Sequence, residues 1–244
     1  MVMHGSVIKQ GLEHNEPAIR KLMDLYYKVD QDEVAGAIFQ HLLSAHPPER
    51  QLMIKYHWCF DYATADINGM EIVKGLHAEM MELGLGNNDR HAGMVMSLYN
   101  RVANRPELAV EFFSTLRSPG YAAWRNLIWA YAAYDPKKAI AAFGDMEKTH
   151  IKPNLDSFRA LLYAHAQAET KNEDALKDLI KMKQQYNLQP QIEHIGCYID
   201  KLVKTGFIAE AIKLAAEIEI PLSNHICGMI FGECAKSLPA DKGS

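Results

Sequence analysis

One apolar pattern recurs along this chain and limits what it can fold into. Four residues at relative positions 0, 3, 4 and 7 appear six times, at intervals of roughly 30 to 38 residues. Side chains three and four residues apart share one face of an α-helix, so each quartet predicts a helix with an apolar face. The quartets are Ala35-Ile38-Phe39-Leu42, Val73-Leu76-His77-Met80, Ala109-Phe112-Phe113-Leu116, Ala139-Ala142-Phe143-Met146, Ala175-Asp178-Leu179-Met182 and Ala211-Leu214-Ala215-Ile218. Such spacing is typical of helical repeat arrays, in which each unit buries its apolar face against its neighbours.

Each quartet helix, here called helix B, follows a second helical stretch of similar length, called helix A. Apolar residues at helical spacing precede Ala139 and Ala175, and Gly206 fits the turn that follows a helix C-terminus. Pro153 and Pro190 end B helices, and the polar residue after each is placed to cap the next A helix. We therefore predict an all-α fold: a right-handed α-solenoid of about six helix pairs, with A helices lining its concave face.

The repeats extend over most of the chain. We expect residues 1–237 to form one solenoid that begins inside a repeat, and residues 238–244 to form a C-terminal tail. The segment 43–58 is the least regular, because Pro47-Pro48 cannot continue a helix. We interpret it as a loop between units; the alternative is an internal domain boundary.

Composition narrows the functional classes. The formal net charge is −4, which does not favour general nucleic-acid binding through clustered lysines and arginines. No apolar run approaches the roughly 18 residues needed to span a bilayer. The cysteines Cys59, Cys197, Cys227 and Cys234 form no CxxC pair, which indicates a reducing compartment.

The repeats resemble those of the pentatricopeptide-repeat family, and most closely its plant-type subclass that alternates long, short and standard units. The likeness runs along nearly the whole chain. It rests on an ordered series of segments: HGSVIKQGLEHN (4–15), IRKLMDLYYKVDQDEVAGAIF (19–39), GLHAEMMELGLGNN (75–88), AAWRNLIWAYA (122–132), EHIGCYIDKLVKTGFIAEAIKL (193–214) and GMIFGECAK (228–236). The last of these resembles the first helix of the family's C-terminal extension.

The alignment of repeats also concerns the start of the chain. Met3-His4-Val7 superimposes on Leu76-His77-Met80, so residue 1 falls inside a B helix. We expect either a truncated relative or a start that lacks upstream repeats and an organelle-targeting peptide. The resemblance implies a mitochondrial protein, or alternatively a plastid one.

The resemblance implies which residues contact RNA. Family members read one base per unit through the fifth residue of helix A and the last residue of the unit. Carried over, these positions give the pairs Arg125 with Asn154, Arg159 with Gln191 and Gly196 with Ser223; Arg20 and Gly93 are further fifth positions, and Asn15 and Asn88 close the units before them. The family usually has Asn, Ser or Thr at the fifth position. Arginine and glycine depart from that pattern.

Two interpretations of Arg20, Arg125 and Arg159 stay open. As a functional stripe, their guanidinium groups would bind phosphates or stack on bases. As structure, they would pair with acidic residues of neighbouring units or of a bound protein.

The sequence predicts no enzyme, metal site or cofactor. Deaminase domains attached to some relatives need HxE followed by PCxxC; His77-Ala78-Glu79 fits HxE, but the chain has no CxxC. His77 lies on an apolar quartet, so we expect a packed histidine. Trp124 is expected in the core and Trp129 is a candidate for exposure.

Three functions fit these observations. The first is an organellar protein that binds single-stranded or ribosomal RNA and acts in RNA metabolism or translation. The second is a scaffold that contacts mainly protein subunits of a mitochondrial assembly such as the mitoribosome. The third is an adaptor that recruits an editing or processing enzyme through its C-terminal end. None involves a membrane span or a small-molecule substrate.

Overall fold

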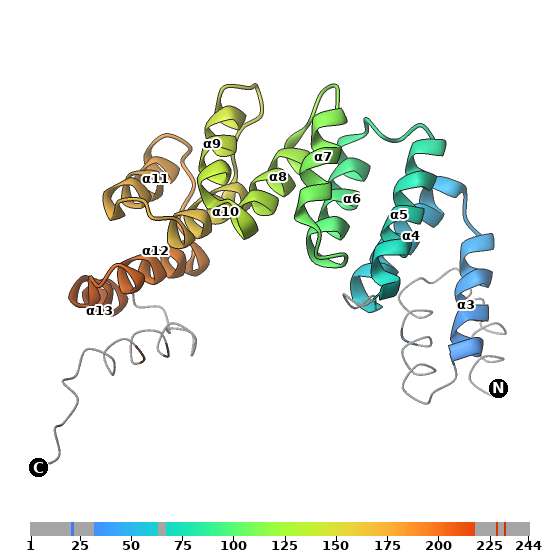
Figure 1. The fold of residues 1–244 in the computed structure, drawn as a ribbon, viewed down its shortest axis with the longest axis horizontal. Coiled ribbons are helices and arrows are strands. Elements are labelled where there is room, and N and C mark those ends of the chain that lie inside the picture. The colour runs from blue at the N-terminus through green and yellow to red at the C-terminus, as the bar shows by residue number, and fades with distance from the viewer. Residues whose placement is uncertain (1–20, 22–31, 63–66, 218–227, 229–231, 233–244) are drawn as a thin grey trace, which may run out of the picture. The chain divides into compact units, whose positions relative to one another are not determined.

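The computed structural model describes residues 21, 32–62, 67–217, 228 and 232, and its regular elements there are all α-helices (Figure 1). The A helices are α4 (Pro48–Tyr62), α6 (Asp89–Arg101), α8 (Tyr121–Tyr134), α10 (Leu155–Gln167) and α12 (Ile192–Lys204). The B helices are α3 (Asp32–Ser44), α5 (Ile67–Glu82), α7 (Pro106–Thr115), α9 (Pro136–Glu147), α11 (Asn172–Gln184) and α13 (Ile208–Glu217). The predicted alternation of A and B helices is confirmed over these ranges.

The chain divides into two compact units, residues 1–85 and residues 86–244. In the described part of the first unit, α4 packs against α3 and α5. In the second, each A helix packs against the A helix of the next pair: α6 against α8, α8 against α10, and α10 against α12. Each of α8, α10 and α12 also packs against the B helices on both sides of it in the chain. The A helices of the second unit therefore form one continuous row.

The quartets supply the buried faces of the B helices, as predicted. Residues of all six quartets are buried: Ile38, Leu42, Val73, Leu76, Met80, Ala109, Phe112, Ala139, Ala142, Phe143, Met146, Ala175, Met182, Ala211 and Ala215. Asp178, the polar member of the fifth quartet, is half-buried and accepts a hydrogen bond from His165 Nε2 at 2.9 Å. The side chains of Ala35 and Ile218 lie outside the described residues. One carboxylate is thus accommodated on an otherwise apolar helix face because a buried histidine forms a hydrogen bond with it.

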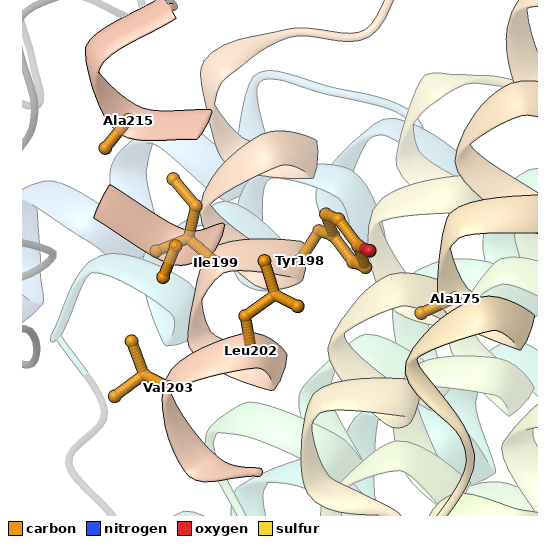
Figure 2. Packing of buried hydrophobic residues seen from close by; sticks show 7 residues of the cluster. Ala175, Tyr198, Ile199, Leu202, Val203 and Ala215 are labelled. Carbon is orange, nitrogen blue, oxygen red and sulfur yellow. The ribbon is translucent and has the colours of Figure 1, made fainter. Parts of the chain in front are cut away.

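The last described helix pair shows how adjacent repeats share a core (Figure 2). Ile199, Leu202 and Val203 of α12 are buried between Ala175 of α11 and Ala215 of α13. Small residues on the B helices let the larger side chains of the A helix pack closely against them. Each A helix consequently depends on B helices from two repeats.

Helix ends follow the local chemistry of the sequence. Gly206, directly after the C-cap of α12, has φ +82°, a left-handed conformation that glycine adopts without strain. The interpretation of residues 43–58 as a loop was wrong, because α3 ends at Ser44 and α4 already begins at Pro48. Proline lacks a backbone N–H, which the first helical residue does not need, so it fits the start of a helix. Within the described residues, no helix has the length and apolar character needed to cross a membrane.

Candidate functional site

The predicted fifth positions lie on the row of A helices. Gly93, Arg125, Arg159 and Gly196 are the fifth residues of α6, α8, α10 and α12, in that order. Arg125 and Arg159 line one pocket of about 770 Å³ on this row. Arg20 and Ser223 lie outside the described residues, as does Asn15.

A carboxylate joins the two arginines. Arg125 Nη1 donates to Asp156 Oδ2 at 3.4 Å, and Arg159 Nη2 lies 3.2 Å from Asp156 Oδ1. Arg125 comes from the preceding A helix, whereas Arg159 lies one turn along α10 from Asp156. All three side chains keep between 33% and 43% of their surface exposed. Arg125 thus pairs with an acidic residue of the neighbouring unit, as one of the two interpretations expects, whereas Arg159 pairs within its own helix, and both guanidinium groups still reach solvent.

Two aromatic rings extend the same pocket. Trp129 and Tyr163 are the ninth residues of α8 and α10, and their ring centroids lie 5.6 Å apart. The Arg159 guanidinium carbon lies 5.4 Å from the Trp129 ring centroid, which is the geometry of a cation–π contact. Trp124, by contrast, is buried against Phe113, as expected. The pocket thus combines planar apolar surfaces with charged groups.

The charges around this pocket nearly cancel. Among its lining residues are the bases Arg101, Arg125 and Arg159 and the acids Asp156 and Glu193. Asp156 and Glu193 are the second residues of α10 and α12, so each follows a fifth-position arginine of the preceding A helix. Sequence reasoning missed these two acids, and this second-to-fifth relation is the signal that could have identified them.

Gly93 serves close packing rather than presenting a side chain. A Cβ built at position 93 would lie 2.5 Å from Ala122 Cβ, far inside van der Waals contact. The Gly93 carbonyl accepts a hydrogen bond from Asn126 Nδ2 at 2.9 Å. The glycine therefore lets α6 and α8 approach each other. Gly196, in α12, is half-buried.

Three predicted last residues of units lie in the described part of the chain, and they are the N-cap residues of the following A helices: Asn88, Asn154 and Gln191. Asn88 Oδ1 accepts from the backbone N–H groups of Arg90 and His91, at 3.1 and 3.3 Å. Asn154 Oδ1 accepts from the backbone N–H groups of Asp156 and Ser157, at 2.9 and 3.3 Å. Both asparagine side chains remain exposed. Capping by Asn154, the polar residue after Pro153, is as predicted.

Gln191 holds the start of α12 through its backbone. Its N–H donates to His194 Nδ1 at 3.2 Å, and His194 Nε2 lies 2.8 Å from the carbonyl oxygen of Leu155. Since Nδ1 accepts, Nε2 carries the proton and donates to Leu155. The buried His194 therefore links the first turns of α10 and α12.

Two groups beside the arginines have shifted pKa values. Burial raises the pKa of Tyr121 to about 12; its hydroxyl donates to Asn154 Oδ1. Burial, followed by the negative charge of Asp200, raises the pKa of the Cys197 thiol to about 11. Cys197 lines the pocket as a neutral thiol and offers no nucleophile at neutral pH.

The described residues contain no cluster of three or more His, Cys, Asp or Glu side chains placed to hold a metal ion. His77 is half-buried on α5, in keeping with a packed residue, and burial lowers its pKa.

Comparison with known proteins identifies the repeats. No family model matches the chain. Among curated proteins, two pentatricopeptide repeat-containing proteins of Arabidopsis thaliana are 29% and 30% identical over 173 and 175 residues. Each alignment covers 70% of this chain but only 28% and 31% of the relatives, so the chain spans less than a third of their length. A third Arabidopsis thaliana relative, named as mitochondrial, is 32% identical over 114 residues, or 46% of this chain and 23% of its own.

A solved structure supports the same assignment of fold. The pentatricopeptide repeat protein PPR10, in complex with an 18-nt psaJ RNA element, matches with a TM-score of 0.52 and 14% sequence identity. The match covers 94% of this chain and 39% of that one. Sequence and fold agree, and the chain belongs to the pentatricopeptide-repeat family.

Proposed function

We propose that this protein binds single-stranded RNA along the row of A helices, without chemistry of its own. The observation that carries the proposal is the pocket in which Arg125 and Arg159 lie beside Trp129 and Tyr163. Guanidinium groups bind phosphates, and aromatic rings stack on bases, so this combination suits a single strand. The RNA bound by PPR10, a protein of the same fold, supports the proposal.

The site would extend beyond this pocket. The array is proposed to comprise residues 1–237. In residues 86–244 it adds Ser223 to the exposed caps Asn88, Asn154 and Gln191, and Arg20 is a further candidate in residues 1–85. Membership of the alternating plant-type subclass, and a mitochondrial or plastid location, belong to the same proposal. One Arabidopsis thaliana relative named as mitochondrial supports the organellar part. The RNA would be an organellar transcript or ribosomal RNA.

Salt dependence of binding tests the proposal. Affinity of the 244-residue chain for a labelled single-stranded RNA should fall steeply as salt rises, because bound phosphates release counterions. The double variant Arg125→Ala/Arg159→Ala should bind more weakly, and each lost phosphate contact should reduce the salt slope by about 0.7. Fluorescence anisotropy at four or more salt concentrations gives both quantities.

A matched control separates local contacts from net charge. Lys148, the C-cap residue of α9, and Lys177 on α11 are 78% and 75% exposed, and neither belongs to an A helix. Lys148→Ala/Lys177→Ala removes the same two positive charges and should leave the slope nearly unchanged. Equal effects of the two double variants would refute binding along the A helices. Absence of RNA binding by the folded protein would refute the proposed function itself.

A scaffold function that contacts mainly protein is the second candidate. Apolar side chains on the B helices favour it: Leu176 and Ile180 on α11 are 38% and 43% exposed, and Ile212 on α13 is 46% exposed. Leu176 and Ile180 are four residues apart and share one helix face. Purification of the protein from its organelle, with and without ribonuclease, distinguishes the two. Protein partners that survive ribonuclease and are lost with Leu176→Ser/Ile180→Ser would establish the scaffold function.

A further inference from the structure

The guanidinium group of Arg159 lies between an aromatic face and a carboxylate. Its carbon is 5.4 Å from the Trp129 ring centroid, and Nη2 is 3.2 Å from Asp156 Oδ1. A flat group with N–H donors therefore lies over the Trp129 ring and beside Asp156.

Arg159 holds this place weakly. It reaches Asp156 through one terminal nitrogen, without the paired bonds that make an arginine–carboxylate contact strong. Its Nε atom is buried and has no hydrogen-bond partner among the described residues. A buried donor left unpaired costs free energy, so the contact is not the best that the pocket can make.

Guanine has the shape and donors of the group that occupies this place. Its Watson–Crick edge carries adjacent donors, N1–H and one N–H of the 2-amino group, which match the two oxygens of a carboxylate. Adenine presents the acceptor N1 on that edge and would meet the carboxylate with like partial charges. We infer that a guanine base of the bound strand replaces the Arg159 guanidinium, stacking on Trp129 and donating to Asp156. This inference rests on the proposed function.

The pocket accommodates the exchange. Its volume of about 770 Å³ lies within the range of small-molecule sites, which runs from about 300 to 1,000 Å³. Tyr163, 36% exposed, continues the aromatic surface beside Trp129. A carboxylate has about four lone-pair positions, so Arg125 keeps its contact with Asp156 Oδ2. The displaced Arg159 is then free to bind a phosphate of the same strand.

Single-base substitution in an unstructured RNA tests the inference. The full chain is titrated with labelled uridine nonamers that carry guanosine, inosine or adenosine at the centre, with the all-uridine nonamer as baseline. Wild type should prefer guanosine to adenosine by at least about tenfold, as one good paired contact to a base provides. Inosine keeps N1–H and lacks the 2-amino group, so its affinity should fall between them.

Two variants and one control assign the preference to the pocket. Asp156→Asn should reduce the preference for guanosine over adenosine to about twofold or less. Asp174→Asn removes the same charge from α11, outside the pocket, where the side chain is 45% exposed, and should preserve the preference. Trp129→Ala should weaken binding of both purine nonamers by about tenfold, because stacking does not depend on the base.

The outcomes separate this inference from the proposed function. Equal affinity of wild type for all four nonamers, with a steep salt dependence, would overturn the guanine site and leave RNA binding intact. No affinity for any nonamer would overturn both. A preference that persists in Asp156→Asn would also overturn the site. The wild-type series alone decides the base preference, even if a variant fails to fold by circular dichroism.

Discussion

At the scale of single residues, the pocket depends on one carboxylate, Asp156, which Arg125 and Arg159 share. Counting along the repeats placed Arg125 and Arg159 at equivalent positions, and the fold brings them to one pocket. Their shared carboxylate, Asp156, was missed because its contact with Arg125 depends on the offset between two A helices. The packing of the two helices sets that offset. The spacing of apolar residues within one helix gives no information about it. A sequence-based search for such acids should compare the fifth residue of each A helix with the second residue of the next. Arg125 with Asp156 and Arg159 with Glu193 are the two examples.

Tyr121→Phe should remove a pH-dependent part of the unfolding free energy. Burial raises the pKa of Tyr121 to about 12, above its ordinary value of roughly 10, so the folded state holds the phenol proton more tightly than the unfolded state. This contribution is complete below pH about 10 and is lost as pH rises toward about 12. The stability of wild type relative to Tyr121→Phe should shrink over that range in urea titrations. A difference that grows with pH would contradict the prediction.

Cys197 should resist alkylation in the folded protein. With a pKa of about 11, roughly one thiol in a thousand is ionised at pH 8, against about a quarter at the ordinary pKa of roughly 8.5. Iodoacetamide should label Cys197 at least about 100-fold more slowly than in urea. Mass spectrometry of the peptide that contains Cys197 measures this in wild type. Equal rates in the two states would show that the thiol is neither buried nor shifted.

At the scale of helices, periodicity carried most of the prediction. The six quartets lie on α3, α5, α7, α9, α11 and α13. Apolar residues at helical spacing form the face that a repeat buries against its neighbours, so their positions predict these helices. The start of α4 was missed because Pro47-Pro48 reads as a break, although proline is as suited to begin a helix as to end one. Boundaries at proline are therefore ambiguous in sequence, and packing decides them.

Gly93→Ala should destabilise the protein. The new methyl group would lie 2.5 Å from Ala122 Cβ, so α6 and α8 must move apart. Overpacking of this kind costs about 1–3 kcal/mol, more than the helix propensity gained. Chemical denaturation followed by circular dichroism measures the change.

Gly144→Ala is the matched control for that experiment. Gly144 is also a helix-interior glycine, in α9, and a Cβ there meets no atom within 4 Å. Replacement should stabilise by about 0.5–1 kcal/mol, the helix propensity of alanine over glycine. If both variants change stability in the same direction, the close approach at Gly93 does not limit helix packing.

At the scale of the whole molecule, contacts are made between neighbours in sequence. In residues 86–217, A helices meet the next A helix and the flanking B helices, so this part of the chain is close to a one-dimensional array. Stability in such arrays is a sum of repeat and interface terms. A destabilising substitution at one end of the array should accordingly lower stability mainly in the neighbouring repeats.

Leu202→Ala tests this locality. Leu202 is 4% exposed in the core shared by α11, α12 and α13, and its truncation should cost about 2–5 kcal/mol. Hydrogen exchange measured by mass spectrometry should show faster exchange in those helices and unchanged protection in α6 and α7. Faster exchange spread evenly over the unit would instead indicate an all-or-none domain.

The side chain that caps the first turn of α8 comes from another repeat. Gly120, its N-cap residue, offers no side chain, and Asp89 of α6 accepts from the backbone N–H groups of Ala122 and Ala123 at 3.0 and 3.1 Å. A repeat cut out at its helix boundaries would leave this acceptor behind. For recombination or engineering, a segment that carries α8 should therefore begin before Asp89, so that it also includes α6.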